Sequence, residues 1–153
     1  MVGFYQVSKA IKDQLDADAF VNTVTIGDIF KVDLNKQTIF PLSHIMLNTG
    51  SYNGNTFNYN VSVICMDIVD ESKEATTDLF VGNDNEQDVL NTQEMVARRL
   101  VEMLRRGDLY DDKFQLANDS ASMEYFVDRF ENKIAGVTIT FDVSTFNDMT
   151  ICD

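Results

Sequence analysis

The sequence predicts an α+β fold, in which an antiparallel sheet of about four to six strands has an N-terminal helix and a second helix packed on one face. Three observations predict it. Residues 4–16 have helical periodicity, residues 20–68 show extended alternating patterns, and residues 91–106 are again helix-like and precede a last strand pattern. A chain of 153 residues has the size of one domain, so we expect a single α+β domain over residues 1–153.

The first helix is predicted from apolar residues that recur at intervals of three and four positions. These are Phe4, Val7, Ile11 and Leu15. Charged residues fall elsewhere around the helix, so residues 4–16 should form a short amphipathic helix that lies on a sheet. Residues 20–26 then alternate in strand fashion until Gly27 and Asp28, where a turn is expected.

Further strand patterns follow. Residues 30–34 alternate apolar and charged side chains, as a half-buried antiparallel strand does, and residues 38–47 are the expected partner strand. Pro41 has no N–H to donate, so it predicts a sheet edge, a bulge or a strand start. Residues 49–55 have a loop composition, and residues 57–65 alternate again, which predicts a long hairpin.

Residues 70–90 break the strand pattern. Their acidic residues are Asp70, Glu71, Glu74, Asp78, Asp84, Glu86 and Asp88. Lys73 is the only basic residue in this range, and Leu79, Phe80 and Val81 form an apolar island within it. We therefore expect a long acidic loop at residues 70–90, whose apolar island is a candidate anchor for a pocket on a neighbouring protein.

The second helix has strong boundary signals. Asn91 and Glu94 are spaced as a capping box, and Gly107 stands where a helix-terminating glycine belongs. The apolar face comprises Val96, Ala97, Leu100, Val101 and Leu104. These features predict a helix at residues 91–106.

The C-terminal third is expected to complete the sheet. Residues 108–120 have the composition of a polar loop, and residues 123–130 fit either a strand or a short helix. Residues 136–143 alternate apolar and polar side chains and predict the closing strand.

Four arginines lie on the arc of the second helix opposite its apolar face. They are Arg98, Arg99, Arg105 and Arg106. Glu94 and Glu102 are spaced to pair with Arg98 and Arg106, which favours an ordinary solvated face. The alternative is a basic face that meets the acidic loop of another copy.

Charge and composition restrict the function classes. The 25 acidic and 12 basic residues give a formal net charge of −13, which disfavours a sequence-reading DNA or RNA binder but suits a protein that encloses DNA without gripping it. No segment approaches the roughly 20 apolar residues of a membrane span, so we expect a soluble protein. Cys65 and Cys152 are too few for a zinc cluster or disulfide scaffold and are expected to be reduced thiols.

No residue set predicts catalysis, and we expect neither enzyme activity nor a cofactor. His44 is the only histidine, which leaves no His–His metal pair, and its place in a strand pattern favours a structural role. Asp84, Glu86 and Asp88 alternate like calcium ligands but lack the glycine and distal glutamate of an EF-hand.

One fragment supports an alternative function. Asp67, Glu71 and Lys73 have the residue types with which magnesium nucleases of the restriction-enzyme fold hold a metal. A nuclease also needs a basic groove, whereas this stretch is among the most acidic in the chain. A magnesium-dependent DNA-processing factor is thus the runner-up hypothesis, and an acidic adaptor that forms no ring is a third.

The order of the predicted elements resembles that of the tail-terminator, tail-completion and neck ring (head–tail connector) proteins of tailed bacteriophages. The resemblance extends to the amino-acid sequences of three segments, residues 21–28, 37–44 and 132–137. These segments look like sequences from phages of the crAss-like group. It covers most of the chain. The resemblance rests on the order of the elements and on these three segments, and it includes no diagnostic motif.

The resemblance implies a structural virion protein that does no chemistry. Copies would form a homo-oligomeric ring in the neck or tail, against portal or other neck and tail proteins, and DNA would pass through without specific binding. Such a protein is made in the host bacterial cytoplasm and has no membrane partner. The expected contacts between copies lie in the loops and on the second helix, at Tyr52, Asn53, Leu79, Phe80, Val81, Arg98 and Arg105.

Overall fold

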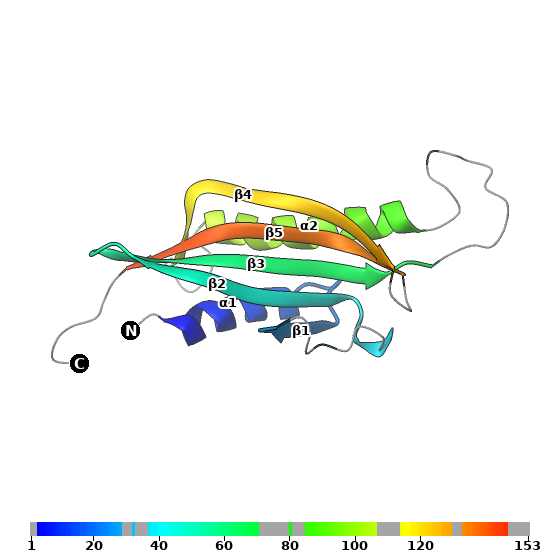
Figure 1. The fold of residues 1–153 in the computed structure, drawn as a ribbon, viewed down its shortest axis with the longest axis horizontal. Coiled ribbons are helices and arrows are strands. Elements are labelled where there is room, and N and C mark those ends of the chain that lie inside the picture. The colour runs from blue at the N-terminus through cyan, green and yellow to red at the C-terminus, as the bar shows by residue number, and fades with distance from the viewer. Residues whose placement is uncertain are drawn as a thin grey trace.

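The computed structural model describes residues 3–28, 32, 37–70, 80, 85–106, 114–129 and 133–146. A five-stranded sheet in the order β1-β2-β3-β5-β4 forms one layer, and two helices form the other (Figure 1). The elements are α1 (Phe4–Asp16), β1 (Thr23–Ile26), the 3-10 helix η2 (Gln37–Ile39), β2 (Leu42–Tyr52), β3 (Thr56–Ile68), α2 (Glu86–Arg105), β4 (Phe114–Arg129) and β5 (Lys133–Phe146). The predicted α+β class, with both helices on one face of the sheet, is confirmed.

The strand directions differ from the prediction at one edge. β2, β3, β5 and β4 pair antiparallel, whereas β1 pairs parallel with β2, Thr25 opposite His44. The sheet is therefore mixed. Alternation of side chains is the same in parallel and antiparallel strands, so the sequence pattern could not reveal this direction.

The segment before β2 contains less strand than predicted. Residues 37–39 form η2 and β2 begins at Leu42, so the strand predicted at residues 38–47 starts four residues late. Of the sheet edge, bulge or strand start that Pro41 predicts, the structure has the strand start. The Phe40–Pro41 peptide bond is cis. Of the strand predicted at residues 30–34, all but Val32 lies outside the described residues.

The β2–β3 hairpin is longer than predicted. β2 continues to Tyr52 and β3 starts at Thr56, so the predicted loop at residues 49–55 shrinks to a three-residue turn. Gly54 in this turn has a φ of 69°, a conformation that glycine adopts without steric cost. The hairpin projects beyond the helices at one end of the molecule (Figure 1).

α2 begins five residues before the predicted start. Glu86 and Asp88 occupy its first turn, where carboxylates interact favourably with the helix dipole. Asn85 precedes the helix, and its side-chain oxygen accepts a hydrogen bond of 2.7 Å from the Asp70 amide. The predicted capping box at Asn91 is thus wrong, as is the placing of residues 86–90 in an acidic loop.

β4 and β5 form a second long hairpin. The predicted polar loop at residues 108–120 is wrong for residues 114–120, which belong to β4, and residues 123–129 are strand rather than helix. The pairing is interrupted between Leu116 and Ala121, where Asn118 has a φ of 60°. This irregularity explains why the local pattern looks like a loop.

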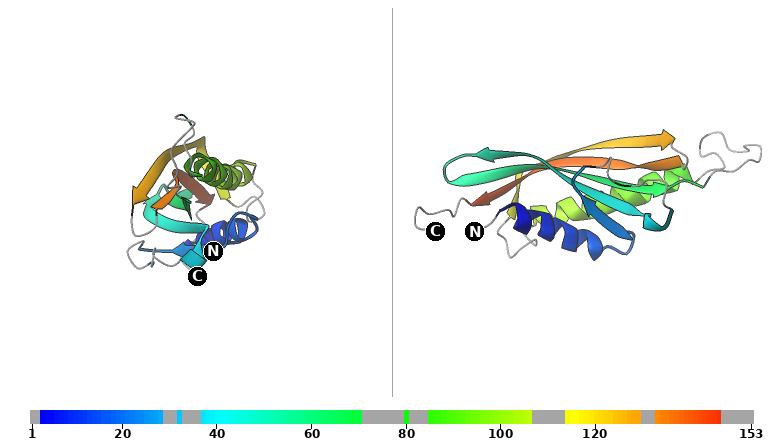
Figure 2. Two further views of the ribbon diagram at one scale, coloured as in Figure 1. Left: turned by 90° about the vertical axis from the view of Figure 1, so that its right-hand side faces the viewer. Right: turned by 60° about the horizontal axis from the view of Figure 1, so that its bottom comes forward.

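The main core lies between the sheet and the helices. α1 contributes Val7, Ile11 and Leu15 to it. α2 and the helix-facing residues of β2, β3, β4 and β5 complete the cluster. Figure 2 shows α1 and α2 side by side over the same face of the sheet. A smaller cluster of Phe40, Leu42, Met66 and Ile134 covers one end of the opposite face.

Candidate functional site

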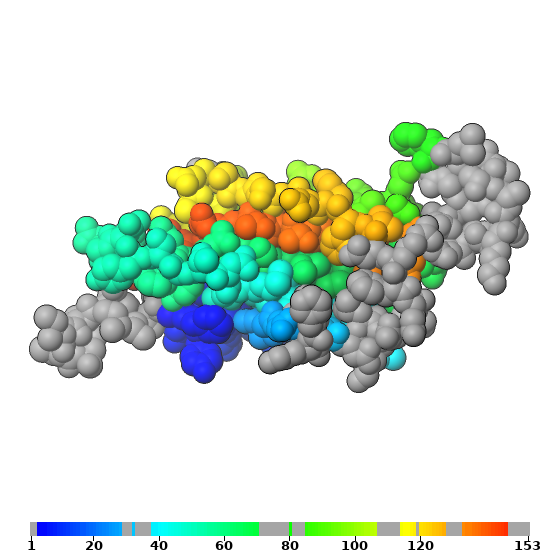
Figure 3. Space-filling view, in the orientation of Figure 1, coloured from blue at the N-terminus to red at the C-terminus, as the bar shows by residue number. Residues whose placement is uncertain are grey.

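The helix-free face of the sheet carries a network of amide and hydroxyl side chains. Asn60 donates to Asp142 over 2.8 Å, and Asn48 donates to the Asn60 oxygen over 3.0 Å. Asn48 also donates to Ser62 over 2.9 Å, and the hydroxyls of Ser62 and Thr140 are 3.0 Å apart. The network links three adjacent strands, and Figure 3 views the molecule from this side.

The charges on this uncovered face are negative. The strand registers place Asp142 of β5 and Glu124 of β4 on it, opposite Asn60 and Thr138 respectively. Among the described residues, the registers place no lysine or arginine there. A surface of this kind offers hydrogen-bonding groups but no cation that would bind a phosphate.

The two outer strands of the described sheet are β1 and β4. On β4, Tyr125 is 57% and Val127 37% exposed, so a pair of large apolar side chains lies at this edge. The Tyr125 hydroxyl donates a hydrogen bond to Glu94 of α2. This bond, above all, raises the pKa of Tyr125.

An apolar groove of about 470 Å³ lies between α1 and β1. Its lining residues are Tyr5, Ser8, Lys9, Lys12, Val24, Thr25, Ile26 and Ile45. Tyr5 and Ile26 are 82% and 48% exposed. The nearby Phe4, which was expected on the buried helix face, is 52% exposed and its ring makes an edge contact with Tyr5.

The arginines of α2 have different environments. Arg98 lies 4.0 Å from Glu94, and Glu102 binds both Arg105 and Arg106, at 2.7 and 3.0 Å. The hydrogen bonds from these two arginines lower the pKa of Glu102 to about 2. The predicted pairs of a solvated face are therefore present. Arg99 departs from the prediction, because it binds Asp18 at 2.7 Å and so attaches α2 to the segment after α1.

The predicted contact residues do not form one site. Tyr52 is 68% exposed and packs edge-on against Phe57, and Asn53 lies in the β2–β3 turn. Phe80 is 84% exposed, and its carbonyl oxygen accepts a hydrogen bond from Gln87 at the start of α2. Figure 1 places the β2–β3 turn and the start of α2 at opposite ends of the long axis. Leu79 and Val81 lie outside the described residues.

Of the three residues of the nuclease hypothesis, only Asp67 is among the described residues. Asp67 is half-buried at the end of β3, and burial is the main cause that raises its pKa. Glu71 and Lys73 lie outside the described residues, as does Asp84 of the alternating acidic triplet. Within the described part of the chain, no three His, Cys, Asp or Glu residues are placed to hold a metal ion.

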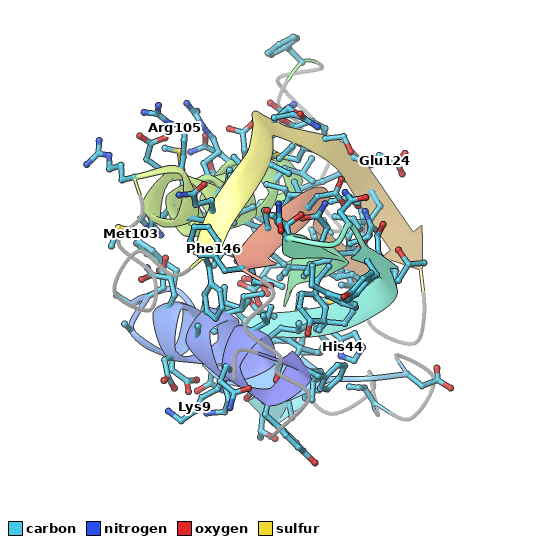
Figure 4. The ribbon with its side chains drawn as sticks, turned by 90° about the vertical axis from the view of Figure 1, so that its left-hand side faces the viewer. Lys9, His44, Met103, Arg105, Glu124 and Phe146 are labelled. Atoms are coloured by element: carbon cyan, nitrogen blue, oxygen red, sulfur yellow. The ribbon has the colours of Figure 1, made fainter. Side chains whose placement is uncertain are left out.

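His44 has the structural role that its place in a strand pattern predicts. It is fully buried, and its ring nitrogens lie 2.7 Å from the Thr25 hydroxyl and 2.8 Å from the Gly27 carbonyl oxygen. The carbonyl can only accept, so Nε2 carries a proton, and in the neutral imidazole Nδ1 accepts from the Thr25 hydroxyl. These bonds join β2 to β1 and to the turn after it, at the position that Figure 4 labels.

Cys65 is also structural. Its thiol is fully buried on β3, and burial raises its pKa to about 12. A thiol with such a pKa stays protonated at neutral pH and is a poor nucleophile.

Local sequence patterns missed two features, the apolar groove and the Asp18–Arg99 pair. The pair joins two residues that are 81 positions apart, and the groove needs Ile45 of β2 beside the consecutive elements α1 and β1. In the described residues, no helix is both long and apolar enough to cross a membrane. No protein-family model matches the chain, and no curated protein matches it.

Proposed function

We propose that this chain is a structural subunit of the neck or tail of a tailed bacteriophage, either a tail terminator or a head–tail connector. Copies form a closed ring against portal or other neck and tail proteins in the virion, and DNA passes through the ring. The chain itself does no chemistry and uses no cofactor. The resemblance of the sequence to these phage proteins supports the proposal.

The observation that carries the proposal is a sheet covered by helices on one face only. The uncovered face presents the network of Asn48, Asn60, Ser62, Thr140 and Asp142. Because the described residues of this face include no lysine or arginine, phosphates would find no cation to bind. The formal net charge of −13 has the same consequence. Such a face is suited to line a passage through which DNA slides.

A closed ring requires a head-to-tail contact, in which each copy binds its two neighbours through two different surfaces. A subunit whose outer strands β1 and β4 have different shapes and side chains can form such a head-to-tail contact. Figure 4 shows Lys9 on α1 and Glu124 on β4 at opposite sides of the molecule. This arrangement supports a ring more than it supports a symmetric dimer.

Native mass spectrometry of the purified chain, with electron micrographs of the same sample, tests the proposal. We expect one high-mass species with a fixed copy number and a central hole. A monomer at every concentration, alone and with its neck and tail partners added, would overturn the ring and favour the adaptor hypothesis.

A DNA cleavage assay with magnesium separates the nuclease alternative from the ring proposal and from the adaptor hypothesis. We expect no cleavage by the wild-type chain. Magnesium-dependent cleavage that is lost in a Lys73→Ala variant would replace the structural proposal with the DNA-processing one.

A further inference from the structure

We infer that the turn of the β2–β3 hairpin is a site of spontaneous covalent modification, at which the side-chain amide of Asn53 is converted to a carboxylate. The backbone nitrogen of Gly54 attacks this amide, and water hydrolyses the product. The reaction needs no enzyme, cofactor or second copy of the chain. The inference therefore goes beyond the proposed ring and does not depend on it.

The sequence places the two reacting groups next to each other. Asn53 is followed directly by Gly54, and this is the only Asn–Gly pair in the chain. The backbone nitrogen of the residue after an asparagine can close a five-membered ring onto the Asn side chain. Every other residue type carries a Cβ that crowds this nitrogen, whereas glycine has none. Ring closure is therefore faster at this position than at the other asparagines of the chain.

The structure exposes the pair to water. Residues 48–55 are all exposed, and the hairpin that carries them projects beyond the helices (Figure 1). In the described part of the chain, no atom outside residues 53–55 lies within 4 Å of the position that a Gly54 Cβ would occupy. Hydroxide and water can therefore reach both reacting groups.

The conformation of the turn makes its opening easy. The Asn55 amide donates to the Asn53 carbonyl oxygen over 2.7 Å, across Gly54 with its φ of 69°. A tight turn with a positive central φ is the strained form of the γ-turn. The Asn53 amide also donates to the Thr56 carbonyl oxygen over 2.9 Å. The peptide after Asn53 must rotate for the attack, and an exposed turn at the tip of a hairpin opens at low free-energy cost.

The reaction balances with water as its only co-reactant. The Gly54 nitrogen loses its proton to hydroxide and forms a bond to the Asn53 Cγ. The bond between Cγ and Nδ2 breaks, and ammonia leaves after it takes a proton from water. Water then opens the resulting succinimide ring at either of its two carbonyl carbons. Opening at Cγ gives aspartate, and opening at the main-chain carbon gives isoaspartate, whose side-chain carbons become part of the backbone.

The modification changes the tip of the hairpin. Either product adds a negative charge to a chain whose formal net charge is already −13. Isoaspartate also lengthens the backbone of the turn by one methylene group. This extra group would displace Tyr52 relative to Phe57, whose ring is its edge-on partner at 6.5 Å. Older molecules would therefore differ from newly made ones in the shape and charge of this tip.

Prolonged incubation of the folded chain at mildly alkaline pH tests the inference. Peptide mass spectrometry detects the replacement of the amide NH2 group by a hydroxyl group, and electron-based fragmentation separates aspartate from isoaspartate. Asn55 is the internal control, because it is exposed in the same turn but is followed by Thr56. We expect Asn53 to lose its amide at least about tenfold faster than Asn55, with isoaspartate among the products.

The Asn53→Gln variant provides a second test, because the longer side chain closes a six-membered ring much more slowly. On ion exchange, the wild type should accumulate a more acidic species that this variant lacks. Equal accumulation in the two chains would show that the reaction takes place elsewhere and would overturn the assignment. Circular dichroism before and after incubation establishes that both samples stay folded.

Two further results would overturn the inference and leave the ring proposal intact. If Asn53 keeps its amide in the folded chain over a time in which a urea-unfolded sample loses it, the folded turn prevents the reaction. Equal rates at Asn53 and Asn55, or a product without isoaspartate, would show that Gly54 is not the attacking group. All of these measurements follow single chains, so none of them depends on whether copies assemble.

Discussion

Arg99 of α2 binds both carboxylate oxygens of Asp18, a residue that precedes it by 81 positions. The two hydrogen bonds measure 2.7 and 2.9 Å, and Asp18 also accepts one of 3.0 Å from the Phe20 amide. The guanidinium carbon lies 5.6 Å from the centre of the Phe20 ring. Together these contacts attach the segment between α1 and β1 to the second helix, and so fix one end of the apolar groove.

The Asp18→Asn substitution should destabilise the fold. It removes the charge that Arg99 binds while keeping the side-chain size, and the Asp18 side chain is only 5% exposed. We expect the free energy of unfolding at neutral pH to fall by about 1–2 kcal/mol, as measured by urea denaturation. Arg98→Met is the control, because Arg98 is 64% exposed and lies 4.0 Å from Glu94. This substitution should change the free energy of unfolding by no more than about 0.5 kcal/mol. Equal losses of stability in the two variants would contradict the stabilising role of the Asp18–Arg99 pair.

The contribution of Asp18 should also depend on pH. Burial acts to raise the pKa of this carboxyl, but the hydrogen bonds from Arg99 and the Phe20 amide outweigh it and hold the pKa below 3.8. A carboxyl with a lowered pKa in the fold stabilises it above the unfolded-state value, and this stabilisation disappears as the pH falls through the folded-state value. The stability difference between wild type and Asp18→Asn should be constant from neutral pH to about pH 5 and shrink below about pH 4.

Local periodicity was sufficient to predict the fold class but not the direction or extent of every strand. Val7, Ile11 and Leu15 are buried as their spacing predicts, because a helix on a sheet buries one stripe. The composition of the first turn of α2 predicts a loop, because Glu86 and Asp88 resemble solvated acidic residues, although carboxylates are also favoured at the start of a helix. Residues 114–120 have the composition of a loop, because edge strands and bulges tolerate polar residues.

The candidate surfaces were less predictable than the fold. Asn58, Asn60 and Ser62 alternate visibly in the sequence, but the pairing of Asn60 with Asp142 depends on the register between β3 and β5. The groove depends on the parallel pairing of β1 with β2, which no local pattern encodes. Long-range register is therefore the information that the local patterns lack.

Asp67→Asn should stabilise the protein at neutral pH. Burial raises the pKa of Asp67, the Ile68 amide opposes this, and Asp70 adds to it, so the ionised carboxylate is disfavoured in the fold. Because the folded-state pKa lies above the unfolded-state value, the stabilisation from this group is present at low pH and is lost as the pH rises through the folded-state pKa. We expect a gain of a few tenths to about 1 kcal/mol at pH 7 that vanishes near pH 3, measured by thermal unfolding.

The same Asp67→Asn variant bears on the nuclease alternative. If Asp67 serves the fold alone, the variant should keep every property of the wild type apart from its stability. A DNA cleavage activity present in the wild type and absent in this folded variant would contradict the purely structural role.

Gln93→Met should also stabilise the protein. Gln93 is 1% exposed on the apolar face of α2, and neither atom of its amide has a hydrogen-bond partner within the described part of the chain. Methionine has a similar length and volume and no group that needs a partner. We expect the free energy of unfolding to rise by about 1 kcal/mol in urea denaturation. A loss of stability instead would show that the amide is satisfied in solution, for example by a buried water.

Gly136→Ala should prevent normal folding, because β3 and β5 approach too closely for a side chain there. Gly136 pairs with Met66, and an added Cβ would overlap the Cys65 carbonyl oxygen and lie 2.8 Å from the Met66 Cα. These atoms belong to the backbone of a central strand, so relief requires the two strands to separate. We expect a loss of at least about 3 kcal/mol or no soluble protein.

Gly50→Ala is the matched comparison for that substitution. An added Cβ at Gly50 would lie 2.8 and 2.9 Å from two carbons of the Phe57 ring, at the end of the β2–β3 hairpin. A ring can rotate where a backbone cannot, so Gly50→Ala should cost about 1 kcal/mol and leave the protein folded. Similar urea midpoints for the two variants would contradict this prediction. They would mean that β3 and β5 can separate at Gly136 as easily as the Phe57 ring can rotate.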